Sequence, residues 1–139
     1  MTASLIIDCS LTMTWCFADE ATDASADIQD RLTHEGVLVP AHWFLEVTNV
    51  LVMAEKRRRI TSSRSDAFVQ LLQVLDIEVD NDIPGRAFDH VLPLCRTHKL
   101  TSYDAAYLDL AVRRRLPLAS LDKDLRAAAE ELGIELLGQ

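Results

Sequence analysis

Four of the 22 acidic residues stand out because of where they fall in the pattern of apolar residues. Asp8 and Asp122 each end a short apolar run. Glu46 and Asp104 lie within helical patterns whose neighbours are apolar. An inward-facing carboxylate is costly to desolvate unless a cation compensates its charge, and few Lys or Arg residues occupy comparable positions. Because oxygen ligands favour Mg²⁺ or Mn²⁺ over Zn²⁺, we predict that these carboxylates form one site for such an ion.

A divalent ion held by carboxylates is suited to phosphodiester hydrolysis. It polarises the phosphate, stabilises charge in the transition state and lowers the pKa of a bound water. We assign Asp8, Asp104 and Asp122 as metal ligands, either direct or through water. Glu46 is either a further ligand or the group that orients the attacking water.

Two serines flank the acids in sequence and could orient them. Ser10 follows Asp8 by two residues, and Ser120 precedes Asp122 by two residues. Each hydroxyl could hydrogen-bond a carboxylate of the site, although helix capping explains each serine about as well.

Each acid also has an explanation that requires no metal. Asp8 and Asp122 stand where side chains cap helices, and Asp104 falls in a first helical turn, where a negative charge complements the helix dipole. Glu46 could be a partly exposed helix residue. Asp124 is better explained as a first-turn helix acid than as a ligand. The four acids taken together are harder to explain in this way.

The elements that must position these residues alternate along the chain. Short apolar runs predict strands at 4–8, 37–39, 77–79, 118–121 and 134–137. Periodicity and capping residues predict helices at 10–17, 21–34, 40–59, 62–75, 86–98, 101–115 and 123–132, the third of them opened by Pro40. This alternation predicts an α/β fold with a parallel sheet covered on both faces. In such sheets the functional crevice lies beyond the carboxyl ends of the strands, where Asp8 and Asp122 fall.

Composition limits the kind of protein. The 139 residues are 49% apolar, which predicts one domain over 1–139 with a packed core. No apolar run is long enough to span a bilayer and no signal peptide is evident, so we expect a cytoplasmic protein. Cys9, Cys16 and Cys95 suggest neither a zinc site nor disulfides. The net charge of −8 argues against a general nucleic-acid coat, but not against a nuclease whose metal reverses the local charge.

Some further residues admit two interpretations. The basic runs at 57–59 and 113–115 could contact phosphate, yet each ends a predicted helix, where cations are usual. Tyr103 could stack on a base, whereas Tyr107 is better explained as a core residue. His42 lies four residues before the predicted glutamate ligand, a metal-ligand spacing on a helix, but we favour a structural role.

Four blocks in the chain resemble a known family. They are Ile7-Asp8-Cys9-Ser10, Pro40 with Glu46-Val47-Thr48-Asn49, Thr101-Ser102-Tyr103-Asp104-Ala105-Ala106-Tyr107-Leu108-Asp109-Leu110-Ala111, and Leu118-Ala119-Ser120-Leu121-Asp122-Lys123-Asp124-Leu125. Each block alone is weak, but the four in this order resemble the PIN-domain family, particularly its VapC-type toxin ribonucleases. Ser120 stands where many relatives carry Thr, a change that keeps the hydroxyl.

The resemblance implies a three-layer α/β/α sandwich with a short central parallel sheet, in which the four acids meet in one pocket. It also implies a divalent-metal-dependent endoribonuclease that cleaves single-stranded or structured RNA. For partners it implies a homodimer and, in the toxin branch, a cognate antitoxin.

Two other classes remain open from the sequence. A phospho-acceptor domain of the receiver or haloacid-dehalogenase kind also places an Asp at a strand end. The dehalogenase kind would need a second Asp where Ser10 stands, and the receiver kind would need a further acid beside Asp8 and a late Lys. The other alternative is a non-catalytic PIN-like module that only binds a partner, against which the presence of all four acids weighs.

Overall fold

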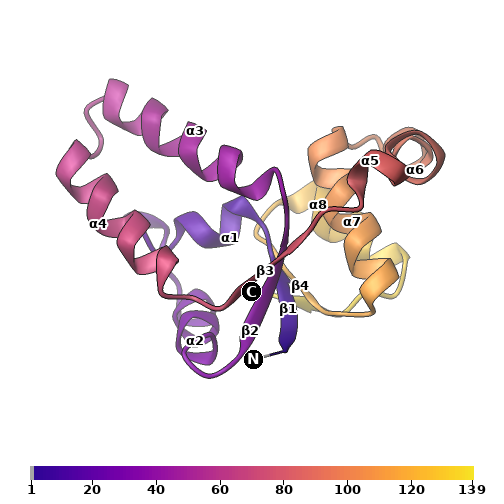
Figure 1. Ribbon diagram of the computed structural model, residues 1–139, viewed down its shortest axis with the longest axis horizontal. Helices are drawn as coiled ribbons and strands as arrows, with labels where there is room; N and C mark the ends of the chain where they lie inside the picture. The colour runs from indigo at the N-terminus through magenta and orange to yellow at the C-terminus, as the bar shows by residue number, and fades with distance from the viewer. Residues whose placement is uncertain (1) are drawn as a thin grey trace.

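A computed structural model describes residues 2–139 as a five-stranded sheet with helices on both sides (Figure 1). The strands are β1 (Ala3–Ile7), β2 (Gly36–Pro40), β3 (Ile77–Asp80), β4 (Leu118–Ala119) and β5 (Leu136–Leu137). Their order is β3-β2-β1-β4-β5, and every neighbouring pair is parallel. The central strand β1 pairs Ile6 with Leu38 on one side and with Leu118 on the other.

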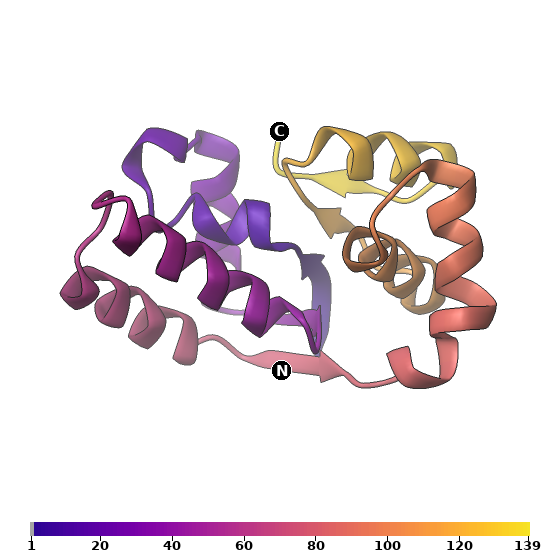
Figure 2. The ribbon, with the colours of Figure 1, turned by 90° about the horizontal axis from the view of Figure 1, so that it is seen from above.

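The helices divide into two layers. They are α1 (Cys9–Met13), α2 (Asp23–Arg31), α3 (Trp43–Lys56), α4 (Ser62–Gln73), α5 (Ile83–Arg86), α6 (Leu92–His98), α7 (Ser102–Arg114) and α8 (Lys123–Glu131). Helices α1 to α4 lie together on one side and α5 to α8 on the other (Figure 2). Starting from the central strand β1, the chain adds β2 and β3 on one side of it and then β4 and β5 on the other. Because the crossovers between parallel strands are right-handed, this reversal places the two groups of helices on opposite faces of the sheet. The predicted three-layer α/β/α sandwich is confirmed.

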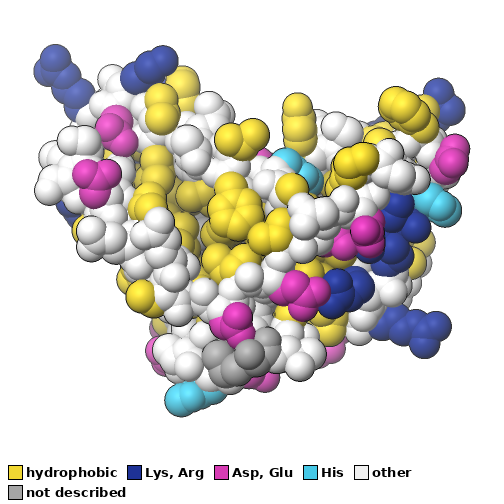
Figure 3. Space-filling model, in the orientation of Figure 1, with side chains coloured by type: hydrophobic (Ala, Val, Ile, Leu, Met, Phe, Trp, Pro, Cys, Tyr) yellow, Lys and Arg dark blue, Asp and Glu magenta, His cyan; other side chains and the backbone are white. Residues whose placement is uncertain are grey.

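The core is built from the strands. Leu5, Ile6, Ile7 and the β2 residues Val37 to Val39 are fully buried, as expected for parallel strands covered on both faces. Between the α3–α4 arm and the sheet lies an apolar hollow of about 340 Å³, visible where apolar side chains gather in Figure 3. Within residues 2–139, no helix is both long enough and apolar enough to cross a membrane.

Several predicted boundaries were wrong. Pro40 does not open a helix but ends β2, paired in register with Asp80, and α3 begins only at Trp43. The predicted helices at 10–17 and 21–34 are shortened to α1 and α2, with a 3₁₀ turn, η1 (Ala18–Glu20), between them. The strands predicted at 118–121 and 134–137 keep only two residues each.

The helix predicted at 86–98 is an interrupted one. It begins three residues earlier as α5, passes through a π-helical segment, η2 (Ala87–Val91), and continues as α6. Pro93 lies in the first turn of α6 and has no N–H to donate to the preceding turn, so a regular α-helix cannot run through this point unbroken.

Candidate active site

The carboxyl ends of β1 and β4 mark the point where the strand order reverses, and Asp8 lies there. It caps α1: its Oδ1 accepts hydrogen bonds from the Leu11 amide at 2.9 Å and from Ser10 Oγ at 2.7 Å. Its Oδ2 accepts one from Ser120 Oγ at 2.5 Å, and the residue is only 3% exposed. Burial raises the pKa of Asp8, while these three hydrogen bonds act to lower it. The carboxylate is therefore fixed in orientation from two sides, by α1 and by the residue that follows β4.

Both serine hydroxyls also accept a hydrogen bond from the turn after β4. Ser10 Oγ accepts from the Leu121 amide at 2.9 Å, and Ser120 Oγ accepts from the Asp122 amide at 3.0 Å. Because each hydroxyl has a single proton, its bond to Asp8 uses that proton and its lone pairs receive the amides. The serines thus tie the end of β1 to the turn that carries Asp122.

Asp122 caps α8, as predicted. Asp122 lies three residues beyond the end of β4, and its Oδ1 accepts a hydrogen bond from the Leu125 amide at 2.8 Å. The charge of Asp122 acts to raise the pKa of Asp8, although less than burial does. The two aspartates that end apolar runs therefore share one electrostatic environment.

Asp104 lies in the first turn of α7, as predicted, and the helix is capped by Thr101, whose Oγ1 accepts from the Asp104 amide at 3.2 Å. Its side chain is half-buried. Burial raises the pKa of Asp104 to about 6, with further contributions from the charges of Asp122, Asp8 and Glu46 in that order. All three other predicted acids therefore act on this one carboxyl group.

Glu46 lies in the first turn of α3, and Tyr107 of α7 holds it. The Tyr107 hydroxyl donates to Glu46 Oε1 at 2.6 Å, and His42 Nε2 lies 3.6 Å from the same oxygen. Burial raises the pKa of Glu46, the hydrogen bond from Tyr107 acts to lower it, and Asp8 adds a further rise.

The sequence predicted Tyr107 only as a core residue and missed its hydrogen bond to Glu46. Tyr107 is fully buried in the core, as predicted, but its hydroxyl reaches the site. The available signal was its position three residues after Asp104, which sets both side chains on one face of α7.

His42 has a structural role here, which agrees with the interpretation favoured from sequence. Its Nε2 lies 3.0 Å from the backbone oxygen of Tyr103, so the ring proton sits on Nε2 because a carbonyl can only accept. The ring packs edge-on against Tyr107, with centroids 5.2 Å apart. Burial lowers the pKa of His42.

We call Asp8, Glu46, Asp104 and Asp122 the open cluster. The charges of the other three acids raise the pKa of Asp104. Among residues 2–139, however, no three carboxylate, imidazole or thiol side chains lie close enough together to bind a metal ion in this conformation. Like charges without a cation between them repel, so a spread arrangement is expected. The metal site remains a prediction.

The chemistry of the open cluster fits a hard cation. Within the described chain, Asp8, Asp104 and Asp122 form no ion pair with Lys or Arg, and the one possible ion-pair partner of Glu46 is His42. The available donors are all carboxylate oxygens, the ligands that Mg²⁺ and Mn²⁺ prefer.

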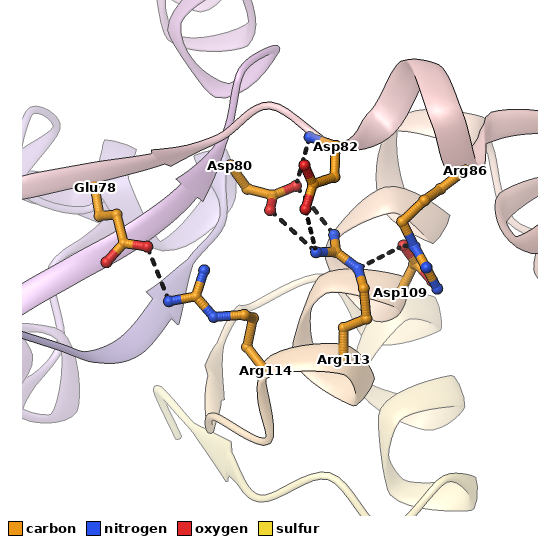
Figure 4. Close-up of polar contacts among 7 residues, drawn as sticks. All are labelled: Glu78, Asp80, Asp82, Arg86, Asp109, Arg113 and Arg114. Atoms are coloured by element: carbon orange, nitrogen blue, oxygen red, sulfur yellow. Dashed lines mark hydrogen bonds and ion pairs between the residues drawn. The ribbon is translucent and has the colours of Figure 1, made fainter.

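A second group of acids is neutralised by arginine (Figure 4). Asp80, at the end of β3, accepts from Arg113 at 3.0 Å, and Asp109 of α7 accepts from Arg86 at 2.8 and 2.9 Å. Arg113 also reaches Asp109 and the exposed Asp82. We call these five residues the paired cluster. The expectation that few cations lie inward was therefore wrong for Arg86 and Arg113.

The pairing also limits which arginines can meet phosphate. Arg113 belongs to the paired cluster and Arg114 binds Glu78 at 2.8 Å. In the other basic run, Arg59 binds Asp19 and Glu20, and its guanidinium lies 3.7 Å from the centre of the Phe17 ring.

Comparison with known proteins places the chain in a family. The model of the PIN domain matches residues 5–131, and the chain belongs to that family. No curated protein sequence matches it.

Solved structures share the fold at low sequence identity. PAE2754 from Pyrobaculum aerophilum aligns with a TM-score of 0.73 and 20% identity, over 96% of this chain and 83% of that one. VapC20 from Mycobacterium tuberculosis, a toxin that cleaves the sarcin-ricin loop, aligns with a TM-score of 0.60 and 16% identity, over 90% and 95% of the two chains. FitAcB from Neisseria gonorrhoeae aligns with a TM-score of 0.64 and 14% identity, over 98% and 96%. These likenesses extend over nearly the whole fold.

Proposed function

We propose that this protein is a divalent-metal-dependent endoribonuclease that acts as the toxin of a toxin–antitoxin pair. The observation that carries the proposal is the open cluster: burial and the charges of Asp122, Asp8 and Glu46 together raise the pKa of Asp104 to about 6. Within residues 2–139, none of these four acids forms an ion pair with arginine or lysine. Membership of the PIN domain family supports a nuclease, and the similarity to VapC20 supports RNA as the substrate.

In this proposal Asp8, Asp104 and Asp122 hold Mg²⁺ or Mn²⁺, and Glu46 is a further ligand or orients the attacking water. When bound, such an ion polarises the phosphate and lowers the pKa of water. Ser10 and Ser120 fix the orientation of the Asp8 carboxylate and thereby set the position of its oxygens.

The proposal includes two protein partners. An antitoxin is supported by the similarity to a toxin–antitoxin complex from Klebsiella pneumoniae, aligned with a TM-score of 0.57 and 19% identity over 87% of this chain and 89% of that one. A homodimer is supported by large apolar side chains at the surface, including Leu45 at 73% and Phe88 at 83% exposure, which association would remove from water.

The direct test is cleavage of a mixed cellular RNA pool by the purified protein. Wild type with Mg²⁺ or Mn²⁺ should cut, whereas EDTA or Asp8→Asn should abolish cutting. Asp27→Asn is the matched control, because Asp27 is an exposed acid of α2 outside both clusters. If folded wild type free of any partner cuts no RNA with either metal, the nuclease proposal fails and a non-catalytic binding module takes its place.

A further inference from the structure

The contact between Tyr107 and Glu46 joins the two helical layers at the site. Helix α3 carries Glu46 in one layer, and α7 carries Tyr107 in the other. Tyr107 is fully buried, and Glu46 Oε1 is the partner of its hydroxyl at 2.6 Å. A buried hydroxyl requires a partner, and a bond to an ionised carboxylate is among the stronger hydrogen bonds in proteins.

Helix α7 therefore contributes twice to the open cluster. Asp104 supplies one carboxylate directly. Tyr107, one turn later, donates a hydrogen bond to a second carboxylate, that of Glu46 in α3. His42 adds a further contact between the two layers, because its Nε2–H donates to the Tyr103 carbonyl of α7 while its ring packs on Tyr107.

The hydrogen bond from Tyr107 engages only one of the two carboxylate oxygens of Glu46. Among residues 2–139, only Oε1 accepts a hydrogen bond, from Tyr107, so Oε2 is left for a ligand or water at the site. A glutamate side chain has three rotatable bonds, and the charges of Asp8 and Asp104 repel this one, so without an anchor the carboxylate would turn away from the cluster.

We propose that Tyr107 is a positioning residue, which holds Glu46 in the open cluster so that its second oxygen can serve the metal or the attacking water. This inference rests on the proposed function. Tyr107 itself touches neither ion nor substrate and acts only through Glu46.

The test is Tyr107→Phe, which keeps the ring in the core and removes only the hydroxyl. Mn²⁺ affinity is measured by electron paramagnetic resonance of free Mn²⁺, and kcat and KM are measured on one RNA that the wild type cleaves. We expect about a tenfold loss of Mn²⁺ affinity and a similar fall in kcat, with KM for RNA unchanged.

A double-mutant cycle separates positioning from general structure. In a Glu46→Gln background the Tyr107→Phe change should add no further loss, because its effect passes through Glu46. The matched control is Thr48→Val, which removes a hydroxyl from the exposed face of the same helix α3, where it bonds the Phe44 carbonyl at 2.7 Å. Thermal unfolding of each variant shows whether the fold is intact.

The outcomes are distinct. If wild type binds Mn²⁺ but Tyr107→Phe binds it equally well, or if the losses from Tyr107→Phe and Glu46→Gln multiply, Tyr107 is a core residue only and the inference is wrong. If wild type neither binds Mn²⁺ nor cuts RNA, the proposed function itself fails and the inference fails with it.

Discussion

The protein contains two groups of carboxylates that differ in what balances their charge. In the paired cluster, Asp80 and Asp109 are 5% and 4% exposed; Arg113 bonds both of them, and Arg86 bonds Asp109. The open cluster has comparable burial at Asp8 but, within the part of the chain that the structure describes, no ion pair with arginine or lysine. The pKa of Asp80 is lowered, with Arg113 as the main cause acting against burial, whereas that of Asp104 is raised. Arg113 therefore favours the charged form of Asp80, whereas burial and the neighbouring acids disfavour the charged form of Asp104, which a bound cation would favour.

The largest expected difference is in folding. Asp109→Ala should lower the free energy of unfolding by about 3 kcal/mol, because it removes the bidentate partner of Arg86 and one of the partners of the partly buried Arg113. Urea unfolding in EDTA measures this. Asp82→Ala removes the exposed member of the same cluster and should change stability by less than about 0.5 kcal/mol. Equal effects of the two variants would contradict the assignment of a structural role to the paired cluster.

Metal should stabilise the protein through the open cluster alone. At about 100 times its dissociation constant, Mn²⁺ should raise the free energy of unfolding by about 2.7 kcal/mol. Thermal unfolding with Mn²⁺ and with EDTA measures the shift. Asp8→Asn should lose most of it and Asp82→Ala should keep it. A shift retained in full by Asp8→Asn would place the ion elsewhere.

The two clusters should respond to pH in opposite directions. Asp104 has a folded pKa of about 6, above its unfolded value, so the folded state binds more protons and loses stability as the pH rises from about 4 to about 6. Asp80 has a lowered pKa, so its contribution is present above about pH 4 and is lost as the pH falls below that value.

The Asp104 effect is isolated by comparison with Asp104→Asn in EDTA. The variant should match wild type near pH 4 and exceed its free energy of unfolding by about 1 kcal/mol at pH 7, a figure reduced for the half-exposed side chain. Urea unfolding at several pH values measures the difference. A constant difference across this range would show that the pKa of Asp104 is not raised in the folded protein.

The smallest effect concerns the two arginines that follow the paired cluster's Arg113 at the end of α7. Arg115 forms no ion pair with residues 2–139 and adopts a left-handed conformation with φ of 52° after α7. Arg115→Gly should therefore stabilise the protein by about 0.5 to 1 kcal/mol. Arg114→Gly, one residue earlier in the helix, should destabilise it by about 1 kcal/mol. Urea unfolding distinguishes the two signs, and a loss in Arg115→Gly would show an interaction of this arginine.

The open cluster was accessible from sequence because its members follow local rules. Asp8 and Asp122 are marked by the apolar runs before them, and Asp104 by the Thr101 cap and the helical period after it. The α/β class followed from the alternation of strands and helices. What local patterns lack is the identity of distant partners, which explains why Tyr107 was placed in the core without its bond to Glu46.

The paired cluster was missed for the same reason. Arg86 and Asp109 are 23 positions apart, and Asp80 and Arg113 are 33 apart, so no periodicity joins them. Pro40 was misplaced because its fixed φ suits both a strand end and a first helical turn. Pairing with β3, a tertiary contact, decides between the two.

The strand order has a consequence for how the protein is made. The chain completes one helical layer before it begins the other, and the open cluster takes Asp8 and Glu46 from the first and Asp104 and Asp122 from the second. The hydrogen bond from Ser120 to Asp8 Oδ2 also requires that the chain has been translated beyond β4. A nascent chain therefore carries two acids of the open cluster once the first layer is made, a third after Asp104 and the fourth only after Asp122, so the cluster cannot assemble before β4 and the start of α8 have been translated.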